Sequence, residues 1–280
     1  MSGAANSDPL QTRPFTTGLA TTADVTVFCD FDGPIVDVSD RYYSTYQLAL
    51  AELQASYRAK GVELPVHLLS KVQFWQMKQD RVPDLEIAMR SGLRYEQVDL
   101  FLHHVSQIVN QPELLSHDRL QPAVEWALSL LHTQGIRLVL VTLRCQAQAT
   151  QMLKEYGLDH LFLDVIGTED QHAAYRNYAE QKAELLAEAI ARRKIHHSNT
   201  SQSYCNEPSM ERSPGAWMVG DTEADILAGQ AVGIPTIGLT CGIRSRSYLE
   251  RFSPDHIHSD LLSAVHYLIR HHFVPCAAYA

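Results

Sequence analysis

The stretch Val25–Gly33, with the sequence VTVFCDFDG, decides the fold class of this chain. Apolar and β-branched residues lead directly into Asp30, Asp32 and a glycine, as expected for a strand that is buried on both faces of a sheet. In open α/β sheets, ligands bind at the carboxyl ends of the strands. Two carboxylates so close together repel each other unless a cation or a shared proton relieves the repulsion. The stretch therefore predicts a buried strand that ends in a functional site, with a hard metal ion as its expected occupant.

Predicted strands and helices alternate in the second half of the chain. The expected strands are Ile136–Val141, Leu161–Ile166, Ala216–Val219 and Pro235–Leu239, and the expected helices are Pro122–Thr133, Ala147–Tyr156, Tyr175–Lys194, Ala224–Val232 and Leu261–His271. Alternating βα units favour a parallel sheet that is covered on both faces. The predicted fold class is therefore α/β, with a Rossmann-like core of parallel strands.

A long helical stretch separates the first strand from this alternation. Helix signals cover Arg41–Lys60, Leu64–Gln79, Pro83–Gly92 and Tyr95–Val109, with no strand signal between them. We expect a helical cap domain over residues 38–116, inserted into a core made of residues 24–37 and 117–280. Residues 1–23 and 192–215 are polar and contain few apolar anchors, so we expect a disordered tail and a disordered loop there.

Composition excludes several classes of protein. The chain has 280 residues, of which 45% are hydrophobic and 20% charged, and this is ordinary globular composition. The net charge of −9 and the lack of a basic stripe argue against nucleic acid as a partner. The sequence has no apolar run of about 18 residues, so no membrane span is expected. Five scattered cysteines and the lack of a signal-peptide core favour a cytoplasmic protein with free thiols.

Four short motifs follow one another along the chain. They are Asp30-x-Asp32-Gly33, Thr142 at the end of LVLVT, Lys182 in the helical run YAEQKA, and Gly220-Asp221-x-x-x-Asp225 after WMV. Each motif alone is weak, but together and in this order they resemble the haloacid dehalogenase-like (HAD) superfamily, whose motifs are DxDGxxxD, hhhT, K and GDxxxD. The resemblance covers about residues 25–240. The helical insert is similar to the first type of cap, which phosphoglycolate phosphatase-like and β-phosphoglucomutase-like members share.

The resemblance implies distinct roles for the first two aspartates. Phosphoryl transfer needs a nucleophile in line with the leaving oxygen, and an aspartate can form an aspartyl-phosphate. Asp30 is the candidate nucleophile. Asp32 lies two residues further and points to the same side if the backbone stays extended, so we expect it to act as general acid and base. In this superfamily an aspartate at that position marks phosphatases and mutases, whereas ATPases typically carry threonine.

The same resemblance implies a Mg²⁺ site. Asp221 is expected to complete it with Asp30 and the backbone carbonyl of Asp32, because Mg²⁺ prefers oxygen ligands. Asp225 is expected one layer further out, bound through water or Lys182. Alternatively, Asp225 is an acid in the first turn of a helix that interacts with the helix dipole.

The transferring phosphoryl group is expected to contact Thr142, the backbone N–H of Leu143, and Lys182. The alternatives are that Thr142 is an ordinary β-branched strand residue and that Lys182 lies on a solvated helix face, as Lys154 or Lys194 could. Two departures from the family pattern are Pro34, where threonine is usual, and Leu143 followed by Arg144. Arg144 could reach the substrate or be paired on the surface.

The cap must hold the part of the substrate beyond the phosphate. Lys78 or Arg81, in a charged segment between two predicted helices, could bind a carboxylate or a second phosphate. The simpler interpretation is an exposed loop between helices.

The sequence therefore predicts a Mg²⁺-dependent phosphatase that acts on a small phosphorylated metabolite through an aspartyl-phosphate. A sugar-phosphate mutase and a non-catalytic binding protein are the alternatives. The sequence leaves the oligomeric state open between monomer and homodimer.

Overall fold

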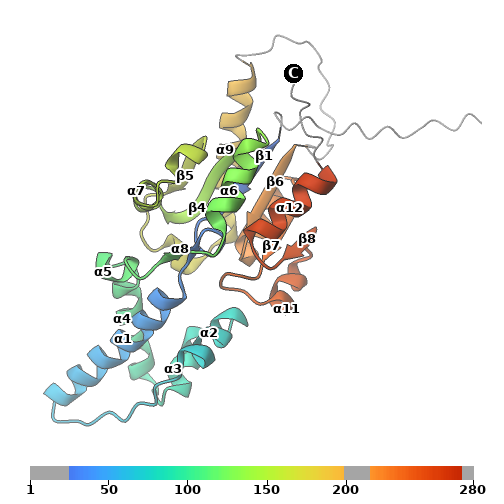
Figure 1. Cartoon of the computed structure of the whole chain (residues 1–280). Coiled ribbons are helices and arrows are strands. Elements are labelled where there is room, and N and C mark those ends of the chain that lie inside the picture. Colours follow the sequence, from blue (N-terminus) through green and yellow to red (C-terminus); the bar gives the residue numbers. More distant parts are fainter. Residues whose placement is uncertain (1–24, 199–214, 273–280) are drawn as a thin grey trace, which may run out of the picture.

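The core of the molecule is a parallel sheet of six strands (Figure 1). The computed structural model describes residues 25–198 and 215–272, and within them the strand order is β5-β4-β1-β6-β7-β8. The strands are β1 (Thr26–Cys29), β4 (Arg137–Cys145), β5 (Asp164–Thr168), β6 (Ala216–Gly220), β7 (Thr236–Leu239) and β8 (His256–His258). The α/β prediction is confirmed. Because β1 pairs with β4 on one side and with β6 on the other, its carboxyl end lies where the strand order reverses, the place at which such sheets bind ligands.

Helices cover both faces of this sheet. Helices α6 (Val124–Thr133), α7 (Gln146–Glu155) and α12 (Leu261–His272) contribute to one apolar cluster, and α9 (Ala179–Ser198) and α10 (Glu223–Ala231) contribute to the other. The side chains of β1 alternate between the two clusters, with Val27 and Cys29 in the first and Phe28 in the second. This double burial explains why the opening strand is apolar at consecutive positions.

The stretch between β2 (Val36–Asp37) and β3 (Arg119–Leu120) is mainly helical and lies at one end of the sheet (Figure 1). It contains α1 (Ser39–Ala59), α2 (Lys71–Gln79), α3 (Asp84–Arg90), α4 (Glu96–Ile108) and α5 (Pro112–Leu115). The chain leaves the core through β2 and returns through β3, and these two strands pair antiparallel. Both crossings are therefore side by side.

Several predicted boundaries are wrong. The helix expected over Leu64–Gln79 begins only at Lys71, where the side chain of Ser70 caps the helix start in a capping box with Gln73. Strand β4 continues three residues beyond Thr142 to Cys145, with an irregular register after Val141.

The region around Lys182 also differs from the prediction. The helix expected over Tyr175–Lys194 is divided into α8 (Ala173–Arg176) and α9, because Asn177 between them adopts the left-handed conformation with φ 54°. Helix α9 continues to Ser198, so the first seven residues of the loop expected over 192–215 are helical instead. Residues 199–214 and the predicted tail over 1–23 lie outside the described residues. In the described part of the chain, no helix has both the length and the apolarity that crossing a bilayer requires.

Candidate active site

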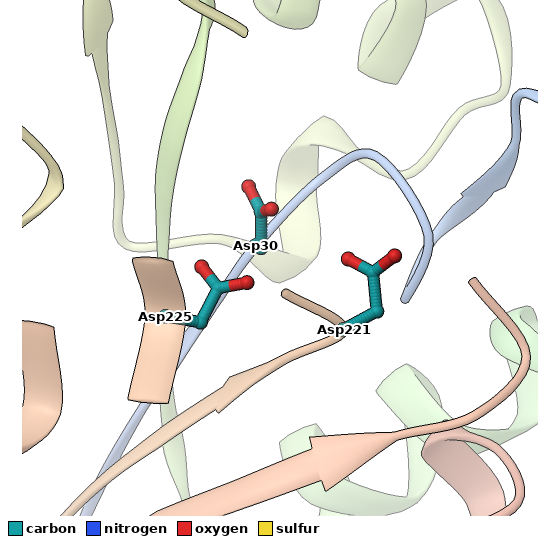
Figure 2. Close-up of side chains that lie close together, drawn as sticks. All are labelled: Asp30, Asp221 and Asp225. Atoms are coloured by element: carbon teal, nitrogen blue, oxygen red, sulfur yellow. The ribbon is translucent and has the colours of Figure 1, made fainter. Parts of the chain in front are cut away.

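Three buried carboxylates meet at the carboxyl end of the sheet (Figure 2). Asp30 follows β1, Asp221 follows β6, and Asp225 lies in the first turn of α10. One carboxylate oxygen from each lies within 4.8 Å of the others. Since β1 and β6 are neighbours in the sheet, their parallel pairing brings Asp30 and Asp221 together from positions far apart in the sequence.

Close backbone contacts hold Asp221 in place. The N–H of Ile243 donates a hydrogen bond of 2.6 Å to Asp221 Oδ2. A Cβ atom at Gly33 would lie 2.1 Å from Asp221 Cγ, and one at Gly242 would lie 1.9 Å from Oδ2. Only residues without a side chain fit at these two positions. The other oxygen, Oδ1, is buried and has no hydrogen-bond partner among the residues that the structure describes.

This cluster fits a divalent cation. Burial raises the pKa of Asp221 well above its usual value, and the nearby Asp225 and Asp30 raise it further. A cation beside the cluster would stabilise the ionised carboxylates and supply a partner for the orphan oxygen. Carboxylate oxygens are also the ligands that Mg²⁺ prefers. The carboxylate of Asp32 is not part of this cluster, and the backbone carbonyl expected from it stays a prediction.

Lys182 lies inside the site rather than on a solvated helix face. Its side chain is 1% exposed, and Nζ lies 2.8 Å from Asp30 Oδ1 and 2.8 Å from Asp225 Oδ1. Burial alone would lower the pKa of Lys182, but Asp225 and Asp30 outweigh it and the pKa is raised. Burial raises the pKa of Asp30 to about 7 although Lys182 opposes the shift. The ammonium therefore joins two of the three clustered carboxylates.

A small cleft opens beside this cluster, with a cavity volume of about 40 Å³. Thr142 and Leu143, in the irregular end of β4, line it next to Asp30, and the hydroxyl of Thr142 accepts a hydrogen bond from the N–H of Arg144. The cleft has space for roughly three water molecules, since each needs about 10–15 Å³. Of the five residues expected to converge, Asp30, Asp32, Thr142 and Asp221 line the cleft, and Lys182 lies behind Asp30.

Asp32 is held by two buried arginines. Arg144 Nε lies 2.8 Å from Asp32 Oδ1, and Arg41 Nη2 lies 3.1 Å from Oδ2. Burial acts to raise the pKa of Asp32, but Arg144 and Arg41 outweigh it and the pKa is lowered. Arg144 is paired, although the pair is buried rather than on the surface, and it also lines the cleft, so contact with a substrate stays a prediction.

The helical insert supplies the opposite wall of the cleft. Arg81, with a left-handed φ of 59°, lines it and places Nε 3.1 Å from Glu223 Oε1. Arg244 binds the same carboxylate and donates a hydrogen bond to the carbonyl of Lys78. The segment between α2 and α3 therefore contacts the core and brings Arg81 to the cleft, although Asp80 and Arg81 are exposed as the simpler interpretation expects.

Lys78 also lines the cleft, and Asp84 and two tyrosine rings hold its side chain. Its Nζ lies 2.8 Å from Asp84 Oδ1 and over the rings of Tyr42 and Tyr175, at 5.4 and 5.5 Å from their centroids. The hydroxyl of Tyr175 donates a hydrogen bond to the other oxygen of Asp84. Asp84 itself does not line the cleft.

Comparison with known proteins agrees with this arrangement. The family model described as "Haloacid dehalogenase-like hydrolase" matches residues 27–239. The chain belongs to this family. As a member of the haloacid dehalogenase-like hydrolases, it is 28% identical over 144 residues to pyrophosphatase PpaX of Halalkalibacterium halodurans, which is 50% of this chain and 57% of that protein. It is 32% identical over 141 residues to phosphoglycolate phosphatase of Aliivibrio fischeri, which is 50% of this chain and 52% of the relative.

A solved structure shows the same fold. A haloacid dehalogenase-like family hydrolase from Streptococcus pneumoniae superimposes with a TM-score of 0.60 at 20% identity, over 89% of this chain and 100% of that one. The curated relatives above are matched over about half their length. The resemblance inferred from the four motifs is therefore confirmed at the level of family and fold.

The sequence motifs did not predict the roles of several residues around the site of this HAD-family protein. Arg41 and Asp118 lie in the stretches that leave and re-enter the core, and no motif marks them. Gly242 and Ile243 follow β7 and hold Asp221. A glycine after a strand is too common to indicate such a role.

Proposed function

We propose that this protein is a Mg²⁺-dependent phosphatase that hydrolyses a small phosphorylated metabolite through an aspartyl-phosphate on Asp30. The observation that carries the proposal is the position of Asp30, which belongs to the acidic cluster and lines the cleft together with Thr142 while Lys182 contacts it. The relatives named above as phosphoglycolate phosphatase and pyrophosphatase support the same reaction class.

The first step is attack by Asp30 on phosphorus. The N–H of Phe31 and Nζ of Lys182 both bind Oδ1 of Asp30, so we assign Oδ2 as the attacking oxygen. We assign Thr142 and the N–H of Leu143 to the phosphoryl oxygens, because both residues line the cleft. Asp32 first takes up a proton as the ester binds, against the two arginines that lower its pKa. As the bond to the leaving oxygen breaks, Asp32 gives that oxygen the proton, and the product alcohol departs.

The second step hydrolyses the aspartyl-phosphate. Asp32 takes a proton from water, the water oxygen attacks phosphorus, and the bond to Asp30 breaks to release inorganic phosphate. The two arginines favour the ionised form of Asp32, which is the form that this step needs. Asp30, Asp221 and the backbone carbonyl of Asp32 would hold Mg²⁺, with Asp225 behind them. Bound there, the ion would screen the repulsion between the carboxylates and the phosphate.

The cap side of the cleft favours a leaving group with negative charge. Lys78 and Arg81 both line the cleft, whereas their acidic partners Asp84 and Glu223 do not. A carboxylate or second phosphate on the leaving group would therefore meet two cations that are already held in place. The small cavity favours a compact molecule.

Release of inorganic phosphate tests this proposal. We expect the protein to hydrolyse p-nitrophenyl phosphate and members of a metabolite phosphate panel with Mg²⁺ and not with EDTA, and compact esters that carry a second anionic group to be the best substrates. Asp30→Asn should abolish turnover, while the matched control Asp99→Asn, at an exposed position on α4, should not change it. No turnover of any ester, or turnover retained by Asp30→Asn, would contradict the proposal.

A further inference from the structure

Asp32 belongs to a closed ring of four charged side chains, which we call the Asp32 ring: Asp32 and the buried Arg41, Asp118 and Arg144. Arg41 binds Asp32 through Nη2 at 3.1 Å and Asp118 through Nε at 2.9 Å. Arg144 binds Asp32 through Nε at 2.8 Å and Asp118 through Nη2. Each of the four carboxylate oxygens pairs with one arginine, and each arginine pairs with one oxygen of Asp32 and one of Asp118. The formal charges of the two acids and two arginines therefore cancel.

The two carboxylates of the ring differ in their access to substrate. Asp32 lines the cleft and its side chain is 19% exposed, whereas the side chain of Asp118 is 0% exposed and lies outside the cleft lining. Asp118 therefore cannot touch a substrate in this arrangement. The carboxylate of Asp118 contacts the two arginines that hold Asp32, its backbone carbonyl accepts a hydrogen bond from the hydroxyl of Tyr156, and its N–H donates one to the carbonyl of Leu115.

Without Asp118, other contacts would determine the orientation of the two arginine side chains. Arg41 also donates to the carbonyl of Val109 and to Asn110 Oδ1, and Arg144 also lies against the sulfur of Met152 and the ring of Phe31. Two guanidinium groups beside one carboxylate carry a net positive charge in a buried place, which is costly. Asp118 cancels that charge and fixes the direction from which both arginines reach Asp32.

We propose that Asp118 is a positioning residue, which acts through Arg41 and Arg144 to aim the Asp32 carboxyl group at the leaving oxygen. This inference rests on the proposed phosphatase function. It assigns a role in the reaction to a residue that lies at the return of the chain from the helical insert, just before β3.

A pair of substrates separates this role from a general effect on folding. The leaving group of p-nitrophenyl phosphate is a weak base and departs without a proton. The leaving group of phenyl phosphate is a stronger base, since phenol has a pKa of about 10, and its departure depends more on receiving a proton. The ratio kcat/KM covers only the steps up to formation of the aspartyl-phosphate. We expect Asp118→Asn to lower kcat/KM about tenfold or more for phenyl phosphate and by less than about threefold for p-nitrophenyl phosphate.

Arg41→Lys provides a second variant, because lysine keeps the charge but cannot bind both carboxylates as a fork. It should show the same selective loss, and it carries the test if Asp118→Asn does not fold. Asp99→Asn and Arg90→Lys, at exposed positions, are the matched controls and should leave both substrates unchanged.

Equal losses for the two substrates in a folded variant, or no loss for phenyl phosphate, would overturn the inference alone. If the unaltered protein hydrolysed neither of these substrates nor any ester of the metabolite panel, the proposed function would fail together with the inference.

Discussion

Lys182 balances charge at the centre of the site. Asp30, Asp221 and Asp225 are all buried, and Lys182 contacts two of them at 2.8 Å. A buried ion pair contributes little net stability when complete, because desolvation offsets the attraction, but removing one partner leaves an uncompensated charge. Lys182 should therefore matter for folding as well as for binding phosphate.

We expect Lys182→Met to lower the free energy of unfolding by about 3–5 kcal/mol, since methionine fills a similar volume but leaves two buried carboxylates without their cation. Urea denaturation at pH 8 in EDTA measures this loss. Lys154→Met is the matched control, because Lys154 is an exposed helical lysine, and it should change stability by no more than about 0.5 kcal/mol. Equal stabilities for the two variants would show that Lys182 does not compensate the cluster.

The residues that the sequence could reveal are those with a fixed spacing. Asp30 and Asp32 end a buried strand, and Asp221 and Asp225 follow another with a GDxxxD spacing, so their chemistry is visible locally. Arg41 and Asp118 are separated by 77 positions in the chain and meet only because β2 and β3 pair. No local pattern encodes such a contact, which is why the Asp32 ring could not be predicted.

At the scale of helices and strands, periodicity predicts the long elements and fails at short or interrupted ones. Helices α1 and α4 lie within two residues of their predicted bounds. Strand β8 has three residues, His256–His258, too few to show an apolar pattern, and it was missed. The break at Asn177 was missed because it depends on a left-handed backbone rather than on glycine or proline.

Three short helices meet through one carboxylate, that of Asp84 at the start of α3. It binds Lys78 of α2 and accepts a hydrogen bond from Tyr175 of α8, so it joins the insert to the core. Burial acts to raise the pKa of Asp84, but Lys78 and Tyr175 outweigh it, and the pKa is lowered from 3.8. These contacts make the ionised form more stable in the folded state than in the unfolded chain.

This shift predicts a dependence of stability on pH. A carboxyl group whose pKa is lowered by folding contributes stability above its unfolded pKa and loses it as the pH falls through the folded value. We expect the difference in unfolding free energy between the unaltered protein and Asp84→Asn to be full near about pH 6 and to shrink below about pH 4. Urea denaturation over this range measures it. Asp99→Asn should show a small difference throughout, and a difference for Asp84→Asn that grew with acid would contradict the assignment.

At the scale of the whole molecule, the site is made by elements that only the complete fold brings together. The acidic cluster comes from β1, β6 and α10, and the loop after β7 holds Asp221 in place. The opposite wall comes from the helical insert. A metal that binds this cluster would bind the folded chain and not the unfolded one, so its binding free energy would add to the stability of the whole fold.

The proposed Mg²⁺ site therefore predicts a stability that depends on Mg²⁺ concentration. At about 100 times the dissociation constant, Mg²⁺ should add about 2.7 kcal/mol to the free energy of unfolding, and Tm should rise in parallel and saturably. Asp221→Asn removes a charged ligand and should abolish most of this increment, whereas Asp99→Asn should keep it. Because the readout is unfolding rather than turnover, it tests the metal site independently of any substrate. An increment that persisted in Asp221→Asn would place the bound ion elsewhere, and no increment in the unaltered protein would argue against Mg²⁺ binding to the cluster before substrate arrives.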